Sequence, residues 1–194
     1  MKIHTQKIIR RNNQGYCSDY KKYRQSLQED FHYECGYCGK IEKVTRREFE
    51  IDHFVPKRLD ENRVTDYSNL VYACFNCNRK KGAKFPTEDK DVCVKGCIGI
   101  LDPVSEEFDK NIERTEEGDI IGITPLGKYI CEKVFKFNER PMRQVWKAMQ
   151  LVEKKNILKA KKEEAGLSPE MMELYIEIDE LLDGLLEVFF NKGE

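Results

Sequence analysis

Apolar side chains in the N-terminal part of the chain recur at the spacing of a helix. Gly15 interrupts the polar start, and the hydroxyl of Ser18 would cap a helix that runs toward Phe31. The apolar positions of this helix are Tyr20, Tyr23, Leu27 and Phe31. They fall on one face, which predicts packing against the rest of the protein and no ligand site.

The C-terminal part carries the signals of three more helices. Thr124-Pro125 is typical of a helix start, and this helix would run to about Phe135. Asn138 would cap a longer helix that has Pro141 in its first turn and ends at Gly166.

The last helix would begin at Ser168-Pro169, and its apolar face lies opposite an acidic one. The apolar positions are Met171, Leu174, Tyr175, Ile178, Leu182, Leu185, Leu186 and Phe189. The last two helices would form an αα-hairpin. Its apolar faces need a partner, which would be each other, the N-terminal helix or another subunit.

The middle of the chain combines two patterns. Apolar positions change from alternation to helical spacing within residues 35–84, where we expect the functional module. Residues 86–119 are rich in acidic residues, Gly and Pro and predict a connector with little regular structure. A turn at Glu117-Gly118-Asp119 would then precede a short strand at 120–123. The predicted segments are a basic helical segment (1–34), the module (35–84), the connector with its strand (85–123) and the helical region (124–194).

The composition is that of a folded protein with a charged surface. Of 194 residues, 40% are hydrophobic and 36% charged, which argues against disorder throughout. Residues 1–11 do not have the pattern of a secretion signal, and no apolar run reaches the ~18 residues of a membrane span. We expect a cytoplasmic protein without a membrane partner, whose eight cysteines are metal ligands or buried thiols.

The two halves of the chain carry opposite charge, although the formal net charge is only −1. Residues 1–84 have 18 Lys and Arg against 11 Asp and Glu, a balance of +7, and residues 85–194 have a balance of −8. Contacts of Lys and Arg with phosphate dominate the binding of nucleic acids, so the basic half would meet a polyanion. The alternative is that solvent-exposed faces simply differ in sign.

Two Cys-x-x-Cys pairs, Cys35 with Cys38 and Cys74 with Cys77, have the spacing of zinc ligands. Four thiolates would hold the ion tetrahedrally and leave no open position, so we expect a structural zinc. The alternatives are two unrelated turns or a redox pair, and no βαβ pattern supports the latter. The pairs are separated by 35 residues, more than the ~15–20 of a zinc ribbon, which indicates an insert.

The insert contains an alternating strand, Phe49-Glu50-Ile51-Asp52-His53-Phe54-Val55-Pro56, that the proline closes. Asn69-Leu70 follows, and Asn78-Arg79-Lys80-Lys81-Gly82 comes after the second cysteine pair. In this order the motifs resemble the HNH endonuclease family, with its ββα-metal fold, over about residues 35–82. The resemblance implies an α+β protein in which a ββα-metal nuclease module with structural zinc precedes a mainly helical C-terminal region.

Hydrolysis of a phosphodiester needs a base to deprotonate water and a cation to neutralise charge on the phosphate. His53 is the only histidine of the insert, and neutral imidazole accepts a proton near pH 7, so we expect it to be the general base. By the resemblance, Asp52 and Asn78 are ligands of a catalytic ion, and Asn69 would orient the imidazole through its amide or backbone carbonyl. Such oxygen ligands suit Mg²⁺ or Mn²⁺.

Two positions depart from a pattern common in the family. Many members have histidine at the position of Asn78, and Asp52 likewise stands in place of a histidine. Both replacements favour Mg²⁺ or Mn²⁺ over Zn²⁺ or Ni²⁺ as the catalytic ion. Glu50 shares the strand face of Asp52 and would support the metal site or face solvent.

Basic residues on three segments flank the proposed site and would contact the phosphates of DNA. They are Arg46, Arg47, Lys57, Arg58, Arg79, Lys80, Lys81 and Lys84. Contacts with the phosphate backbone position a protein without reading sequence, so we expect little base specificity from the module alone.

The leading interpretation is a metal-dependent endonuclease that cleaves DNA. One alternative is a zinc-stabilised nucleic-acid-binding module without catalysis. Another is a phage-defence effector nuclease that depends on a partner docked on the helical hairpin, where a second copy of the chain would also fit. The remaining cysteines are Cys17, Cys93, Cys97 and Cys131. We expect them to be buried free thiols. The alternative is that Cys93 and Cys97 join a second metal site.

Overall fold

Two short antiparallel strands and the helix that follows them form the centre of the protein. The computed structural model describes residues 1–45 and 47–191. Strand β1 (Glu50–His53) pairs with β2 (Leu70–Ala73), and His53 lies opposite Leu70. Helix α2 (Phe75–Lys81) starts directly after β2 and packs on β1. Because every residue of β2 is buried, this strand anchors the module in the core.

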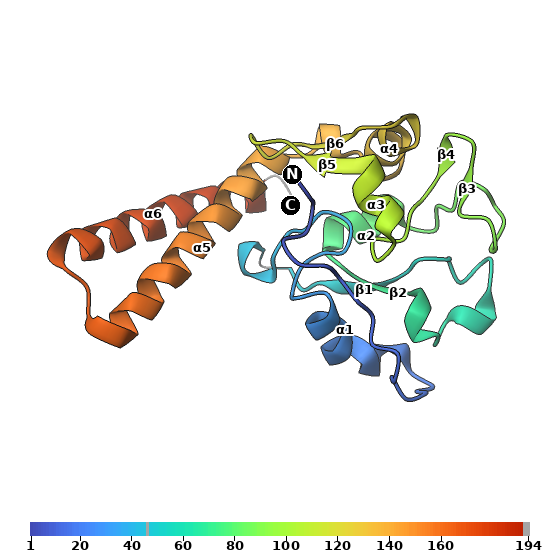
Figure 1. Cartoon of the computed structure of the whole chain (residues 1–194), viewed down its shortest axis with the longest axis horizontal. Helices are drawn as coiled ribbons and strands as arrows, with labels where there is room; N and C mark the ends of the chain where they lie inside the picture. Colours follow the sequence, from blue (N-terminus) through green and yellow to red (C-terminus); the bar gives the residue numbers. More distant parts are fainter. Residues whose placement is uncertain (46, 192–194) are drawn as a thin grey trace.

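The N-terminal helix forms where the apolar spacing predicts it, but it begins differently. A 3-10 turn, η1 (Tyr20–Tyr23), leads into α1 (Arg24–Asp30), which packs against β2 (Figure 1). The carboxylate of Asp19 caps η1 by accepting a hydrogen bond from the amide of Lys21, so the expected cap by Ser18 is wrong. The predicted packing face is confirmed for Tyr23, Leu27 and Phe31, which are buried, whereas Tyr20 is only half-buried.

The connector contains more regular structure than its composition predicts. Its elements are β3 (Val94–Lys95), β4 (Ile98–Gly99), α3 (Glu106–Asn111), β5 (Ile112–Arg114) and β6 (Ile120–Gly122). Ser105 caps α3, and Phe108 and Ile112 are buried, so a few apolar residues suffice to order this acidic stretch. The predicted turn and strand at 117–123 are present as the end of the β5–β6 hairpin.

Short turns connect this central part to the long helices. Thr124 caps α4 (Pro125–Tyr129) as predicted, and the helix continues as a π-helical turn, η5 (Ile130–Val134). Asn138 does not cap the next helix, because it lies inside a 3-10 turn, η6 (Phe137–Glu139). Helix α5 begins only after Pro141. The other 3-10 turns are η2 (Glu42–Val44), η3 (Glu61–Arg63) and η4 (Tyr67–Asn69).

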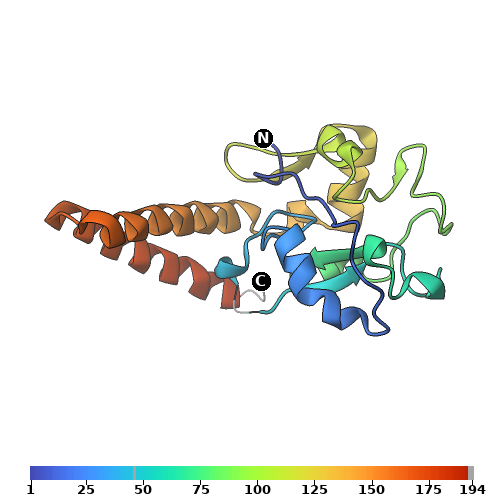
Figure 2. The same ribbon diagram turned by 60° about the horizontal axis from the view of Figure 1, so that its bottom comes forward.

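Helices α5 (Met142–Ala165) and α6 (Pro169–Asn191) form the predicted αα-hairpin. The hairpin projects from the rest of the protein as a long arm (Figures 1 and 2). Its apolar faces pack on each other around Ala148, Val152, Ile178 and Leu182, and Val44 from η2 joins them near the base. Leu174 does not join this core as predicted, because its side chain is exposed.

A second, larger core joins all the segments before the hairpin. It combines residues from Ile3 to Met142, with the cysteine pairs and β2 near its middle. Residues from all four predicted segments contribute to this core. Among the described residues, no helix has both the length and the apolar composition to cross a membrane.

Candidate active site and structural metal centre

The four cysteines of the two Cys-x-x-Cys pairs meet in the interior. Cys35 and Cys38 lie in the loop after α1, Cys74 directly precedes α2, and Cys77 lies within α2. All four are buried, and their sulfur atoms lie within 4.8 Å of one another. The Sγ atoms of Cys38 and Cys74 are 3.8 Å apart, which matches the edge of about 3.8 Å of a tetrahedron with Zn–S bonds of about 2.3 Å. The ligand set therefore fits zinc.

Two arginines from outside the module approach this cluster. The Nη1 atom of Arg140 lies 3.3 Å from the sulfur of Cys77, and the Nη2 atom of Arg114 donates to the carbonyl of Cys38 at 2.6 Å. Burial raises the pKa of the Cys35 thiol, so thiolates at this place need cations beside them. The two guanidinium groups would add their positive charge to that of a bound ion. The order of the sequence motifs did not indicate these two arginines, because both come after the module in the sequence.

His53 ends β1 and is held in one tautomer. Its Nε2 atom lies 2.9 Å from the carbonyl oxygen of Val64. Because a carbonyl only accepts, Nε2 carries the hydrogen and Nδ1 is left unprotonated. Tyr20 packs edge-on against the ring, with 4.7 Å between the ring centroids. Burial lowers the pKa of His53, and the nearby Lys57 and Lys81 lower it further, so the imidazole is neutral near pH 7.

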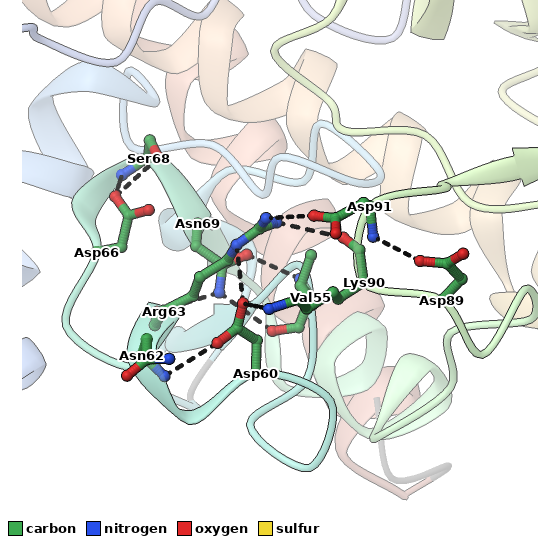
Figure 3. Close-up of polar contacts among 10 residues, drawn as sticks. All are labelled: Val55, Asp60, Asn62, Arg63, Asp66, Ser68, Asn69, Asp89, Lys90 and Asp91. Atoms are coloured by element: carbon green, nitrogen blue, oxygen red, sulfur yellow. Dashed lines mark hydrogen bonds and ion pairs between the residues drawn. The ribbon is translucent and has the colours of Figure 1, made fainter.

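Asn69 acts on the loop beside His53, and its amide contacts backbone groups there. Its Oδ1 atom accepts from the amide of Val55 at 2.8 Å, and its Nδ2 atom donates to the carbonyls of Val55 and Arg63 (Figure 3). Arg63 directly precedes Val64, whose carbonyl holds His53. The amide of Asn69 thus contacts the loop that leads to Val64, and the hydrogen bond described for the His53 imidazole goes to Val64; that Asn69 orients the imidazole stays a prediction.

The same loop is fastened by ion pairs. Asp60 caps η3 and pairs with Arg63 and Lys90, and Arg63 also reaches Asp91 (Figure 3). The segment that carries Val64 is therefore tied to the chain after the module.

Asp52 is buried, and its carboxylate contacts two side chains. Lys81 lies 2.9 Å from Oδ2 of Asp52, and the hydroxyl of Tyr37 donates to the same oxygen at 2.5 Å. Lys81 also donates to the carbonyl of His53 at 2.7 Å. Burial raises the pKa of Asp52, while Lys81 and Tyr37 oppose this change.

Lys81 is therefore not a surface contact for DNA. Its side chain is 0% exposed, and its ammonium group is used inside the protein. The expectation that it contacts phosphate is wrong, because α2 turns this residue toward β1.

Asn78 contacts Glu50 rather than Asp52. Its Nδ2 atom donates to Oε2 of Glu50 at 2.5 Å, and Arg79 lies 3.6 Å from the other carboxylate oxygen. Glu50 is partly buried. Strand β1 therefore presents two carboxylates to α2, one paired with Lys81 and one with Asn78.

Glu50 and Asn78 line an open pocket of about 650 Å³. Tyr20, Lys21, Arg24 and Arg47 form part of its wall. Three of these residues come from the N-terminal segment, which the sequence analysis did not include in the site. Tyr20 links the pocket to His53, because its ring contacts the imidazole.

The other residues expected to contact DNA differ in their exposure and in their partners within the protein. Arg47 and Arg79 are exposed and stack on the ring of Phe75, at 4.2 and 5.0 Å from its centroid. Lys57 is exposed and lies over the ring of Tyr20. Arg58 forms a bidentate pair with Glu88.

Two of the three remaining expected contacts lie on or after α2. Lys80 is half-buried, and Lys84 is exposed and lies 3.3 Å from the carbonyl of Val134. Arg46 lies outside the described residues.

The remaining cysteines do not form a second metal site within the described part of the chain, where only the four-cysteine cluster has metal-ligand geometry. Cys131 is buried, and burial raises its pKa to about 12. Cys97 is exposed, so the expectation of a buried thiol is wrong at that position. Cys17 and Cys93 are half-buried.

Comparisons with known proteins agree with the module. Residues 35–84 match the family described as HNH endonuclease. Septu protein PtuB from Bacillus thuringiensis is 32% identical over 78 residues, which make up 40% of this chain and 30% of PtuB. The similarity thus covers less than a third of that relative. The comparison with solved structures found no match.

Proposed function

We propose that the HNH module makes this chain a metal-dependent endonuclease that hydrolyses DNA phosphodiester bonds, with His53 as the general base. The observation that carries this proposal is the tautomer of His53. The carbonyl of Val64 holds Nε2–H and leaves the lone pair of Nδ1 for a proton from water. The lowered pKa keeps the base neutral at physiological pH.

In this reaction His53 accepts the proton, and two arginines bind the phosphates. As Nδ1 of His53 takes a proton from water, the water oxygen attacks phosphorus and the bond to the leaving oxygen breaks. The leaving oxygen takes a proton from solvent water, and the proton on His53 returns to solvent afterwards. The carbonyl of Val64 then accepts from an imidazolium ring, whose charge strengthens that hydrogen bond. The exposed Arg47 and Arg79 would hold the phosphates on either side.

Asp52 and Asn78 are the proposed ligands of a catalytic Mg²⁺ or Mn²⁺, and Glu50 joins them on the basis of its contact with Asn78. Carboxylate and amide oxygens fit such a hard ion. The ion would neutralise charge that develops on the phosphate. Glu50 and Asn78 line the open pocket, whereas Asp52 is paired with Lys81 in the interior.

A plasmid-nicking assay tests the proposal. The purified protein should nick plasmid with Mg²⁺ or Mn²⁺, and a chelator should stop the reaction. His53→Ala should lower the rate by about 10²- to 10⁴-fold, the usual contribution of a general base. His32→Ala is the matched control, because that imidazole lies outside the module and should be dispensable. Zinc content and circular dichroism should be the same in all three proteins. Undiminished nicking by His53→Ala would exclude His53 as the base.

The ion pair of Asp52 with Lys81 favours one alternative, a zinc-stabilised module that binds nucleic acid without cleaving it. Such a module would bind duplex DNA with a steep salt dependence and leave it intact with every divalent ion.

The other alternative is a phage-defence effector that needs a protein partner on the hairpin. Full activity of the isolated chain would argue against it.

A further inference from the structure

The projecting hairpin has an apolar groove that nothing in the described chain covers. The groove has a volume of about 430 Å³ and lies between α5 and α6. Its apolar lining consists of Leu151, Ile157, Leu158, Leu174, Ile178 and Leu181. The side chain of Ile157 is 53% exposed, and those of Leu174 and Leu181 are each 46% exposed. Contiguous apolar surface of this kind is typical of a protein interface.

The two helices that form the groove carry opposite charge over their whole lengths. Helix α5 carries seven Lys and Arg against three Glu, whereas α6 carries seven Asp and Glu and no basic residue. Lys154 and Glu177 line the groove on opposite helices. Within the part of the chain that the structure describes, neither forms an ion pair, whereas the neighbouring Lys155 pairs with Asp179.

We infer that the groove is the contact surface for a second copy of this chain. A two-fold axis along the hairpin would place α5 of each copy over α6 of the other, so that the basic helix meets the acidic one twice. Rotation about such an axis does not change the position of a residue along the length of the hairpin. Lys154 of one copy would then face Glu177 of the other, and the apolar linings would cover each other.

A surface that carries both signs around one apolar strip is complementary to itself. A purely basic or purely acidic partner would find like charge on one of the two helices, which disfavours it. The inference does not depend on the proposed function, since it rests on the hairpin alone. If both hold, the dimer brings two nuclease modules into one particle.

The mass of the full-length protein in solution tests this inference directly. Sedimentation or light scattering over a range of concentrations should give the mass of a dimer. Leu181→Glu should give a monomer, because it puts a charge in the apolar strip. Since the side chain of Leu181 is nearly half exposed, this variant should keep the helical content of the wild type.

Charge exchange distinguishes a second copy from any other partner. Lys154→Glu and Glu177→Lys should each weaken self-association by about tenfold or more. The double variant should recover it, because the exchanged charges face each other again across the two-fold axis. Lys159→Glu is the control, since this exposed residue lies about 140° around α5 from Lys154 and outside the groove.

Three outcomes would overturn the inference. The wild type would be a monomer at every concentration, Leu181→Glu would remain a dimer, or the double variant would stay as weak as the single ones. A lone monomer that binds a different protein through the groove would indicate a heterologous partner instead.

Discussion

The buried side chain of Lys81 holds the end of β1 in place in this module. Its ammonium group joins the carboxylate of Asp52 to the carbonyl of His53, and so it fixes the end of β1 from inside. From the sequence, Lys81 belongs to a run of basic residues next to Asn78 and suggests a phosphate contact. Its position on α2 relative to β1 gives it a structural role.

Lys81→Met should therefore destabilise the protein strongly. Removing one partner of a buried ion pair costs about 3–5 kcal/mol, because the remaining charge stays buried and unpaired. Urea unfolding should show this loss for Lys81→Met and only a small change for Arg79→Met, an exposed neighbour on the same helix. Adding Asp52→Asn to Lys81→Met should restore much of the stability. Equal stability of Lys81→Met and wild type would mean that the buried pair is not formed.

The contact of Glu50 with Asn78 could not be read from the sequence, although both residues were noticed. Alternation along β1 places Glu50 and Asp52 on one face, as predicted, but it does not say which residue of α2 each one meets. The distance in sequence between strand and helix leaves that choice open. Asn78 lies level with Glu50, and Lys81, one turn later, lies level with Asp52.

At the scale of elements, local signals predicted the helices that have clear caps. Thr124, Gly166 and Ser168 start or end helices in the structure as expected. The predictions failed where a short element depends on tertiary contacts. Helix α3 has six residues and an acidic sequence, and it is held mainly by the burial of Phe108. Propensity and composition contain too little information about such an element.

The packing of α4 on the β5–β6 hairpin depends on the absence of a side chain at one position. A Cβ atom added to Gly127 would lie 1.8 Å from the carbonyl oxygen of Asn111, a backbone atom at the end of α3. Gly127→Ala should therefore push α4 away and lower the free energy of unfolding by about 2 kcal/mol or more.

Gly184→Ala gives the opposite expectation and serves as the control. Gly184 lies inside α6, and an added Cβ would meet nothing within 4 Å. Alanine is preferred to glycine in a helix interior by about 1 kcal/mol, so this variant should be more stable than wild type. Thermal unfolding of the two variants beside the wild type measures both effects. A Gly127→Ala variant as stable as the wild type, or more stable, would contradict the close contact at Gly127.

At the scale of the whole molecule, the four-cysteine cluster connects parts that are distant in sequence. Arg114 binds the carbonyl of Cys38 and stacks on Trp146, the only tryptophan of the chain, near the start of α5. The four-cysteine cluster, the β5–β6 hairpin and the base of the arm are thus in contact through one arginine.

Trp146 should therefore report the loss of zinc. Binding of a structural zinc is worth on the order of 10 kcal/mol in small modules, so a strong chelator should unfold the region around the cysteines. We expect the fluorescence of Trp146 to shift toward the red, while much of the helical circular dichroism remains because α5 and α6 share a separate core. Added zinc should reverse the shift. Unchanged fluorescence after complete zinc release would show that the cluster does not depend on the ion.

The arginines and tyrosine that reach the module from both sides also limit how it could be exchanged between proteins. Tyr20 covers His53 from the N-terminal side, while Arg114 and Arg140 approach the cysteines from the C-terminal side. Residues 35–84, the part recognised as a family unit, are thus not a transferable cassette. A graft of those residues alone would leave its imidazole and its metal centre without neighbours. Recombination that kept these contacts would have to carry both flanking segments along.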